Sequence, residues 1–282
     1  MNNILVPYDF SETSREALNF AIKIASVNKA KITLVHIIYA SPLYKSVYFD
    51  EMTVTPSGPS ITQQLQLDAQ KELDKVKNEI VPLPIKSEIK TSTGDIAPAI
   101  LLEAQKANAD LIVMGRANSN IIEDLFLGSI TEKIIRKSKI PVFAIDKAIE
   151  PSKIRKILCP SNLKEEKNEF FLELKKLQEY FQAELHLLLV NTPQHFQTDD
   201  QAKKKFENYI KNHDLKNCTT HFVNYLSEDK GIVEFQSKHH MDMIAMSTHG
   251  NKGIKHWFQL DITEEVIQHL NCPIWTYYPH NI

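Results

Sequence analysis

The segment ILVPYD at residues 4–9 returns as ILCPSN at residues 157–162, and this repetition decides how the chain folds. The same offset of 153 residues aligns KITLVHII (residues 31–38) with ELHLLLVN (residues 184–191). Each segment holds a short apolar run of the kind that forms a buried strand. The chain of 282 residues therefore contains an internal repeat.

The second half of each copy repeats at an offset of 132 residues, so the second copy has lost 21 residues by comparison with the first. DLIVMG at residues 110–115 aligns with DMIAMS at residues 242–247. IPVFAI at residues 140–145 aligns with CPIWTY at residues 272–277. The alignment predicts two tandem domains, which are residues 1–148 and residues 152–282.

Apolar strand signals alternate with helical spacing in the first copy. The strands are predicted at residues 4–6, 32–38, 85–91, 111–114 and 142–145. Between them, Leu65, Ala69, Leu73 and Val76 step by three or four residues and predict one face of a helix. Thr13 and Glu16 are spaced as a capping box at the start of the first helix.

Five continuous apolar strands separated by four helices predict an α/β fold. Each copy is expected to form a five-stranded, Rossmann-like parallel sheet that is covered by helices on both faces. In such open sheets, ligands bind beyond the carboxyl ends of the strands, where the strand order reverses. The candidate site residues should therefore lie at that edge.

Composition narrows the function. The chain has 43% hydrophobic and 24% charged residues, and its 33 basic and 35 acidic residues give a net charge of -2. This balance gives no electrostatic reason to expect a nucleic acid or an anionic membrane as partner. We find no apolar run of about 20 residues and no signal peptide at the N-terminus. Three widely spaced cysteines indicate free thiols. Together these features favour a cytoplasmic location for the protein.

Three features of the first copy converge on the carboxyl edge. Asp9 ends the first strand, Gly115 ends the fourth, and Gly128-Ser129 open the last helix. Free N–H groups at a helix N-terminus bind phosphate, and glycine allows close approach to the backbone. Two simpler readings stay open: Asp9 as an Asx-turn residue before the first helix, and Gly128-Ser129 as an ordinary loop and N-cap.

These motifs resemble the universal stress protein family, over essentially the whole chain and in both copies. The family signature is glycine, two residues, glycine, nine residues, then glycine and Ser or Thr. Here it reads Gly115, two residues, Asn118, nine residues, Gly128-Ser129. The opening ILVPYDFSE, the strand LIVMG and the closing SITEKIIRKSKIPVFAI are also similar to that family. The resemblance implies a fold of the adenine nucleotide alpha hydrolase type.

In ATP-binding members, the aspartate after the first strand contacts adenine. The resemblance implies that Asp9 contacts adenine here, and that Met114 and Gly115 lie along the ribose and adjoining phosphate. Main-chain N–H groups would bind phosphates, and two apolar side chains would line the base pocket. The N–H groups that would bind phosphates are those of Gly128, Ser129 and Ile130. The side chains that would line the base pocket are Pro7 and Ile37. The implied ligand is ATP, ADP or AMP, with or without Mg²⁺.

Asn118 stands where the family has glycine. Asn tolerates positive φ better than most residues, but its side chain would stand close to a phosphate, so the number of phosphates stays open. The family pairs through its last strands. The resemblance therefore implies an internal pseudo-dimer through residues 142–145 and 274–277, and it leaves a homodimer and an unknown protein partner open.

The second copy has lost the site residues. Asn162 stands for Asp9, Ser247 for Gly115, and Leu260-Asp261 for Gly128-Ser129. A carboxylate at about 4 Å from a phosphate costs roughly 4 kcal/mol at an effective dielectric near 20. We therefore expect no ATP in the second copy.

We recognise no catalytic motif and expect a binding protein, not an enzyme. A nucleotide-free interaction scaffold and a weak ATPase are the alternatives. His239, His240, Asp242 and His249 come close together in the sequence, but neighbouring helix positions point in different directions, so a metal is not expected. The role of residues 41–60 stays open.

Overall fold

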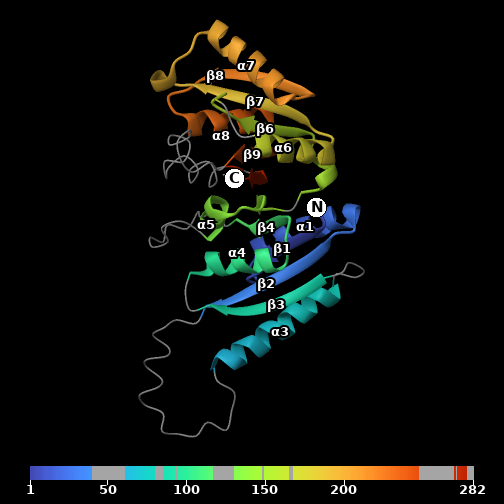
Figure 1. The fold of residues 1–282 in the computed structure, drawn as a ribbon. Coiled ribbons are helices and arrows are strands. Elements are labelled where there is room, and N and C mark those ends of the chain that lie inside the picture. Colours follow the sequence, from blue (N-terminus) through green and yellow to red (C-terminus); the bar gives the residue numbers. More distant parts are fainter. Residues whose placement is uncertain are drawn as a thin grey trace. The chain divides into compact units, whose positions relative to one another are not determined.

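The structure is a computed structural model (Figure 1). The residues that it describes are 1–39, 61–79, 85–92, 95–116, 130–147, 149–164, 168–247, 270 and 272–277. They divide into two compact units, Met1–Gly115 and Arg116–Ile282. Residues 41–60 lie outside the described residues. The predicted boundaries, 1–148 and 152–282, stay a prediction.

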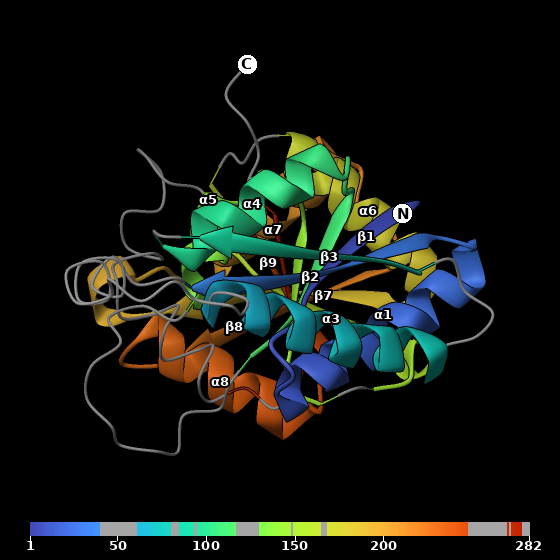
Figure 2. The same ribbon diagram turned by 90° about the horizontal axis from the view of Figure 1, so that it is seen from below.

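The first unit holds a parallel sheet in the order β3-β2-β1-β4. Its strands are β1 (Asn3–Pro7), β2 (Lys31–Tyr39), β3 (Ile85–Ser92) and β4 (Leu111–Gly115). Its helices are α1 (Glu12–Asn28), α3 (Ile61–Glu79) and α4 (Ile96–Lys106). Figure 2 shows α1 and α3 on one face of this sheet and α4 on the other. The predicted alternation of strands and helices is confirmed here.

Helix burial follows the apolar spacing with one exception. On α1, the buried apolar side chains are Ala17, Leu18, Phe20, Ala21, Ile24 and Ala25. On α3, Ala69, Leu73 and Val76 are buried, whereas Leu65 is 49% exposed. The prediction that Leu65 belongs to the buried face is therefore wrong. Its spacing is correct, but among the described side chains of α3 the buried ones begin only at Ala69.

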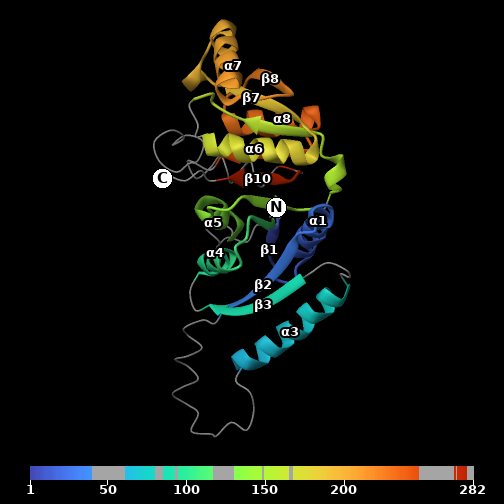
Figure 3. The ribbon, with the colours of Figure 1, turned by 45° about the vertical axis from the view of Figure 1, so that its right-hand side comes forward.

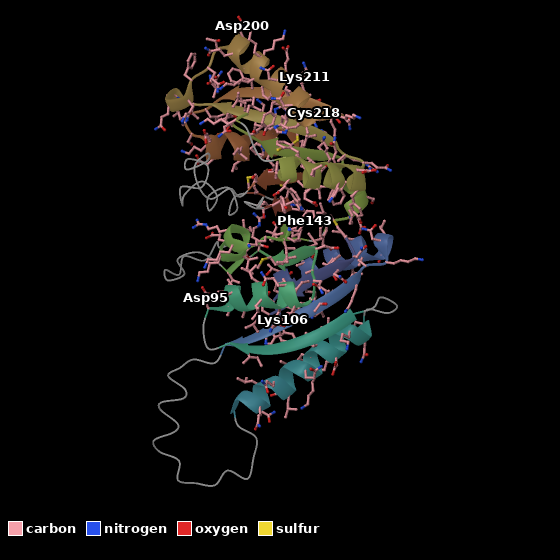
Figure 4. All side chains as sticks on the ribbon, in the orientation of Figure 1. Asp95, Lys106, Phe143, Asp200, Lys211 and Cys218 are labelled. Atoms are coloured by element: carbon pink, nitrogen blue, oxygen red, sulfur yellow. The ribbon has the colours of Figure 1, made fainter. Side chains whose placement is uncertain are left out.

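The start of α1 also differs from the prediction. Ser11 is the N-cap, and its Oγ accepts a hydrogen bond from the backbone N–H of Ser14 at 3.2 Å. The predicted capping box of Thr13 and Glu16 is wrong, because α1 already begins at Glu12. Asp95 caps α4 in the same way, accepting from the N–H of Ala97 (Figure 4).

The second unit holds strands in the order β5-β10-β9-β6-β7-β8. Its strands are β5 (Val142–Ile145), β6 (Lys156–Pro160), β7 (Glu184–Asn191), β8 (Cys218–Asn224), β9 (Met243–Ser247) and β10 (Ile274–Tyr277). Its α-helices are α5 (Ile130–Lys137), α6 (Asn168–Phe181), α7 (Asp199–His213) and α8 (Glu228–His239). Two short 3₁₀ turns are η1 (Pro151–Lys153) and η2 (Pro193–His195).

In this unit the last strand of the first copy meets the last strand of the second. β5 pairs with β10 in antiparallel register, with Ala144 opposite Ile274, and the other described pairs are parallel. This is the internal pseudo-dimer pairing that the resemblance implied. Figure 3 shows α6 on one face of the sheet and α8 on the other. Two domains of the predicted α/β type are thus joined in tandem.

Aromatic side chains fill the core around that pairing. Phe143 of β5, which is labelled in Figure 4, is fully buried with its ring centroid 6.3 Å from that of Phe181. Trp275 of β10 is also fully buried, and its ring centroid lies 6.0 Å from that of Phe170. The three cysteines are free thiols, as predicted. None of the helices in the described ranges is long and apolar enough to cross a membrane.

Candidate functional site

The carboxyl edge of the first sheet brings several predicted site residues together. Pro7 pairs with Val35, which places Ile37 just beyond it on β2. β1 also pairs with β4, which ends at Met114 and Gly115. Asn118, Gly128 and Ser129 lie outside the described residues. Ile130 begins α5, is 38% exposed and belongs to the second unit.

Asp9 forms a tight turn between β1 and α1. Its Oδ1 accepts from the backbone N–H of Ser11 at 3.0 Å and from the Ser11 hydroxyl at 2.5 Å. Partial burial raises the pKa of the Asp9 carboxyl, but hydrogen bonds from Ser11 and Ser14 outweigh this and hold the pKa below its usual value. Asp9 is therefore ionised at neutral pH.

The second copy keeps the same turn without the charge. Oδ1 of Asn162 accepts from the backbone N–H of Lys164 at 3.0 Å, which is the same bond between the same relative positions. The following residue is left-handed in both copies, with φ of 67° at Phe10 and 56° at Leu163. Because asparagine forms this turn as well as aspartate does, the turn does not require the negative charge of Asp9.

Gly115 has a packing role that the sequence did not predict. A Cβ on Gly115 would lie 2.7 Å from the carbonyl carbon of Thr13 and 2.8 Å from the backbone nitrogen of Ser14. These are backbone atoms at the start of α1, so they have little freedom to shift. The glycine is thus needed for close contact between β4 and α1, whether or not a ligand binds. The local sequence carries no signal for this contact.

Three rings next to Asp9 form an aromatic cluster in the first copy. The ring of Phe10 lies 5.4 Å from that of Tyr8 and 4.8 Å from that of His36, measured between centroids. Nδ1 of His36 is hydrogen-bonded to the carbonyl of Tyr8 at 2.8 Å, so this histidine has a structural partner within the first copy. The repeat places Ser161, Leu163 and Leu189 at the equivalent positions of the second copy.

The carboxyl edge of the second sheet carries acidic side chains. Glu228 begins α8 next to the buried Asp229, and His195 Nδ1 lies 3.7 Å from Glu228 Oε1. Burial, together with Asp229, raises the pKa of Glu228 to about 7, although Lys164 opposes this. A phosphate is not favoured beside such carboxyl groups. Leu260 and Asp261, which stand in the second copy for Gly128-Ser129, lie outside the described residues.

A buried ion pair immediately follows Gly115 and was not predicted. The Arg116 side chain is 2% exposed, and its Nη2 lies 3.4 Å from Asp146 Oδ2. The same nitrogen donates to the carbonyl of Leu270 at 2.5 Å, and the Arg116 backbone N–H donates to the carbonyl of Ile145 at 2.7 Å. Burial lowers the pKa of the guanidinium, and Asp146 opposes that shift. Arg116 thus ties the end of β5 to the chain preceding β10.

Metal ligands do not gather in the part of the chain that the structure describes. No three His, Cys, Asp or Glu side chains there could hold one ion. His239 ends α8, His240 follows it as the C-cap, and Asp242 accepts from the backbone N–H groups of Arg155 and Lys156 instead. His249 lies beyond these residues.

Comparison with known proteins identifies the family. A model of the universal stress protein family matches residues 1–146 and again residues 153–277. The chain belongs to the universal stress protein family. Its proteins act in stress responses, and this chain has the tandem form, with two family segments in one polypeptide.

Single-domain universal stress proteins match half of this chain. Universal stress protein MJ0531 of Methanocaldococcus jannaschii is 31% identical over 144 residues, which cover 51% of this chain and 81% of the relative. Stress response protein NhaX of Bacillus subtilis is 27% identical over 161 residues, which cover 51% of this chain and 97% of the relative.

The tandem arrangement also occurs among solved structures. A universal stress protein from Archaeoglobus fulgidus superposes with a TM-score of 0.70 and covers 98% of both chains. At a sequence identity of 17%, this superposition shows a shared fold alone. Another universal stress protein, solved in complex with cAMP, covers 52% of this chain at 18% identity and a TM-score of 0.39.

Proposed function

We propose that this universal stress protein binds ATP or another adenine nucleotide at the carboxyl edge of its first copy. The observation that carries the proposal is the contrast between Asp9 and Asn162. Both form the same turn with the same hydrogen bond, yet only the first copy keeps a carboxylate. Because the turn does not need that charge, we infer that the Asp9 carboxylate serves to bind a ligand.

The chemistry of Asp9 suits an adenine nucleotide. An ionised carboxylate accepts hydrogen bonds from an exocyclic amine or a ribose hydroxyl, and such charge-assisted bonds are stronger than neutral ones. Met114 and Gly115 end β4 on the same sheet edge. The phosphates, with or without Mg²⁺, are assigned to the N–H groups of Gly128, Ser129 and Ile130 on the family motif. We propose regulation by binding, without catalytic turnover.

A matched pair of variants tests the site. Asp9→Asn keeps the turn that Asn162 already forms, and it removes the charge. A hydrogen bond to a charged group contributes about 1.5–3 kcal/mol, so we expect affinity for the bound nucleotide to fall about 10- to 100-fold. Calorimetric titration of the full chain with ATP, AMP and cAMP measures this loss.

The control is Asn162→Asp, which places a carboxylate in the equivalent turn of the second copy. We expect it to leave nucleotide affinity unchanged, and both variants should keep the circular dichroism spectrum of the wild type. Wild-type affinity in Asp9→Asn would refute the assignment of Asp9. No binding by the wild-type protein would favour the nucleotide-free scaffold, and phosphate release that depends on Asp9 would favour a weak ATPase.

A further inference from the structure

Two histidines of the second copy share a hydrogen bond beneath α8. Nδ1 of His186 on β7 and Nε2 of His221 on β8 lie 2.9 Å apart. Their rings are nearly parallel, with centroids 5.2 Å apart and planes inclined by 17°. The His186 side chain is more than nine-tenths buried, and the first copy has Thr33 at its position. The universal stress protein signature does not include these two residues, which we call the histidine pair.

The pair is covered by the end of α8. The Phe235 ring lies 4.8 Å from His221 and stacks on His239 at 4.1 Å, measured between centroids. The His239 ring is itself 6.1 Å from His221. A movement that separates His186 from His221 would therefore disturb both β8 and the last turn of α8.

The contact sets a limit on protonation. At 2.9 Å, one of the two nitrogens must carry the proton and the other must accept it. Two neutral rings satisfy this condition, and so does a pair with one additional proton. A second additional proton places a positively charged N–H on each side of the contact, and these repel each other.

We propose that the histidine pair is an acid-sensitive contact, whose double protonation opens the edge formed by β8 and α8. This would give the second copy a role in sensing acidification. The proposal is independent of nucleotide binding, because it uses only residues of the second unit. It also requires no metal, in keeping with the lack of any three-residue ligand cluster within the described ranges.

Some charged groups around the histidine pair favour its protonation, and others oppose it. From β7, Glu184 Oε2 lies 3.6 Å from His186 Nε2 and favours its protonation, while Thr219 of β8 donates to the same carboxylate. From the chain before β9, Asp242 also favours it. Lys156 of β6 and His239 of α8 oppose it.

Burial has a larger effect on the pKa values of the two histidines than the carboxylates have. It lowers the pKa of His186 and, with repulsion from His186 and His239, lowers the pKa of His221 to about 4. An unfolded histidine titrates near 6.5. Because both pKa values are lower in the folded protein, the neutral histidine pair stabilises the fold above pH 6.5. This stabilisation is lost as the pH falls from there towards 4.

Hydrogen exchange of the full chain at pH 7.0 and 4.5, corrected for intrinsic rates, tests the proposal. In the wild type we expect the protection of amides in β8 and α8 to fall on the order of 100-fold more than that of β6. In His221→Gln, which keeps a hydrogen-bonding side chain but does not titrate, most of this difference should disappear. His240→Asn is the control: it changes an exposed histidine at the left-handed C-cap of α8 and should behave as the wild type.

Equal loss of protection in β6, β8 and α8 of the wild type would overturn the proposal, and this comparison needs no variant. A His221→Gln protein that keeps the full wild-type difference would overturn it as well. If His221→Gln does not fold, the wild-type comparison still decides. A difference that His240→Asn abolishes would assign the effect to the helix end instead of the histidine pair.

Discussion

Replacing Arg116 by methionine is expected to lower the free energy of unfolding of the second unit by about 3–5 kcal/mol. Methionine keeps much of the volume but removes the charge. Asp146, whose side chain is 7% exposed, then keeps a negative charge without the guanidinium that lies 3.4 Å from it. The carbonyl of Leu270 also loses its hydrogen bond. Urea unfolding followed by tryptophan fluorescence measures the effect, since Trp275 is fully buried in this unit.

Two further variants separate the ion pair from a general effect of the substitution. Arg15→Met changes an exposed arginine on α1 and should stay within about 0.5 kcal/mol of the wild type. In the double variant Arg116→Met with Asp146→Asn, no buried charge remains, so part of the lost stability should return. A loss below about 1 kcal/mol in Arg116→Met would mean that the ion pair does not hold β5 to the chain before β10.

Replacing Gly115 by alanine should be the second large effect. Its new Cβ would meet three backbone atoms of Thr13 and Ser14 at 2.7–2.8 Å, so β4 or α1 has to move. Overpacking of this kind typically costs 1–3 kcal/mol, and we expect about 3 kcal/mol because the contacts are with backbone. Differential scanning calorimetry of the full chain measures the loss in the first unit.

Gly231→Ala is the matched control for that prediction. A Cβ on Gly231 would meet side-chain atoms of Val190 and Tyr225, at 2.6 and 3.0 Å. Side chains can rotate away, and alanine also favours the interior of α8 by up to about 1 kcal/mol. We therefore expect a smaller loss than at Gly115. Equal losses in the two variants would contradict the special role of the backbone contact.

The repeat predicted most of the fold because buried strands leave a local signal. Val142–Ile145 has the same bounds in the prediction and in β5, and Leu111–Met114 lies within β4. The residue at which a helix begins depends on local hydrogen bonds that the apolar pattern does not show. Thr13 fits a capping pattern, but the turn formed by Asp9 brings Ser11 to the cap first.

The candidate site was predictable only where its residues end strands. Asp9 and Gly115 were found because apolar runs stop beside them. The ion pair of Arg116 and Asp146 and the histidine pair were missed, because each joins residues about 30 or more positions apart. The contact that explains Gly115 is also long-range, with α1 at the other end of the first unit. Such pairs leave no periodic pattern in a single sequence.

The number of adenine nucleotides bound per chain tests the central claim, that the chain has two copies of one fold and one retained site. The full chain is stripped of bound nucleotide and titrated calorimetrically with ATP, and nucleotide released by denaturing the protein as purified is quantified alongside. We predict one site per chain in the wild type and in Asn162→Asp, with binding strongly weakened in Asp9→Asn. Two equivalent sites, or no bound nucleotide and no heat of binding, would show that the chain does not have one retained site.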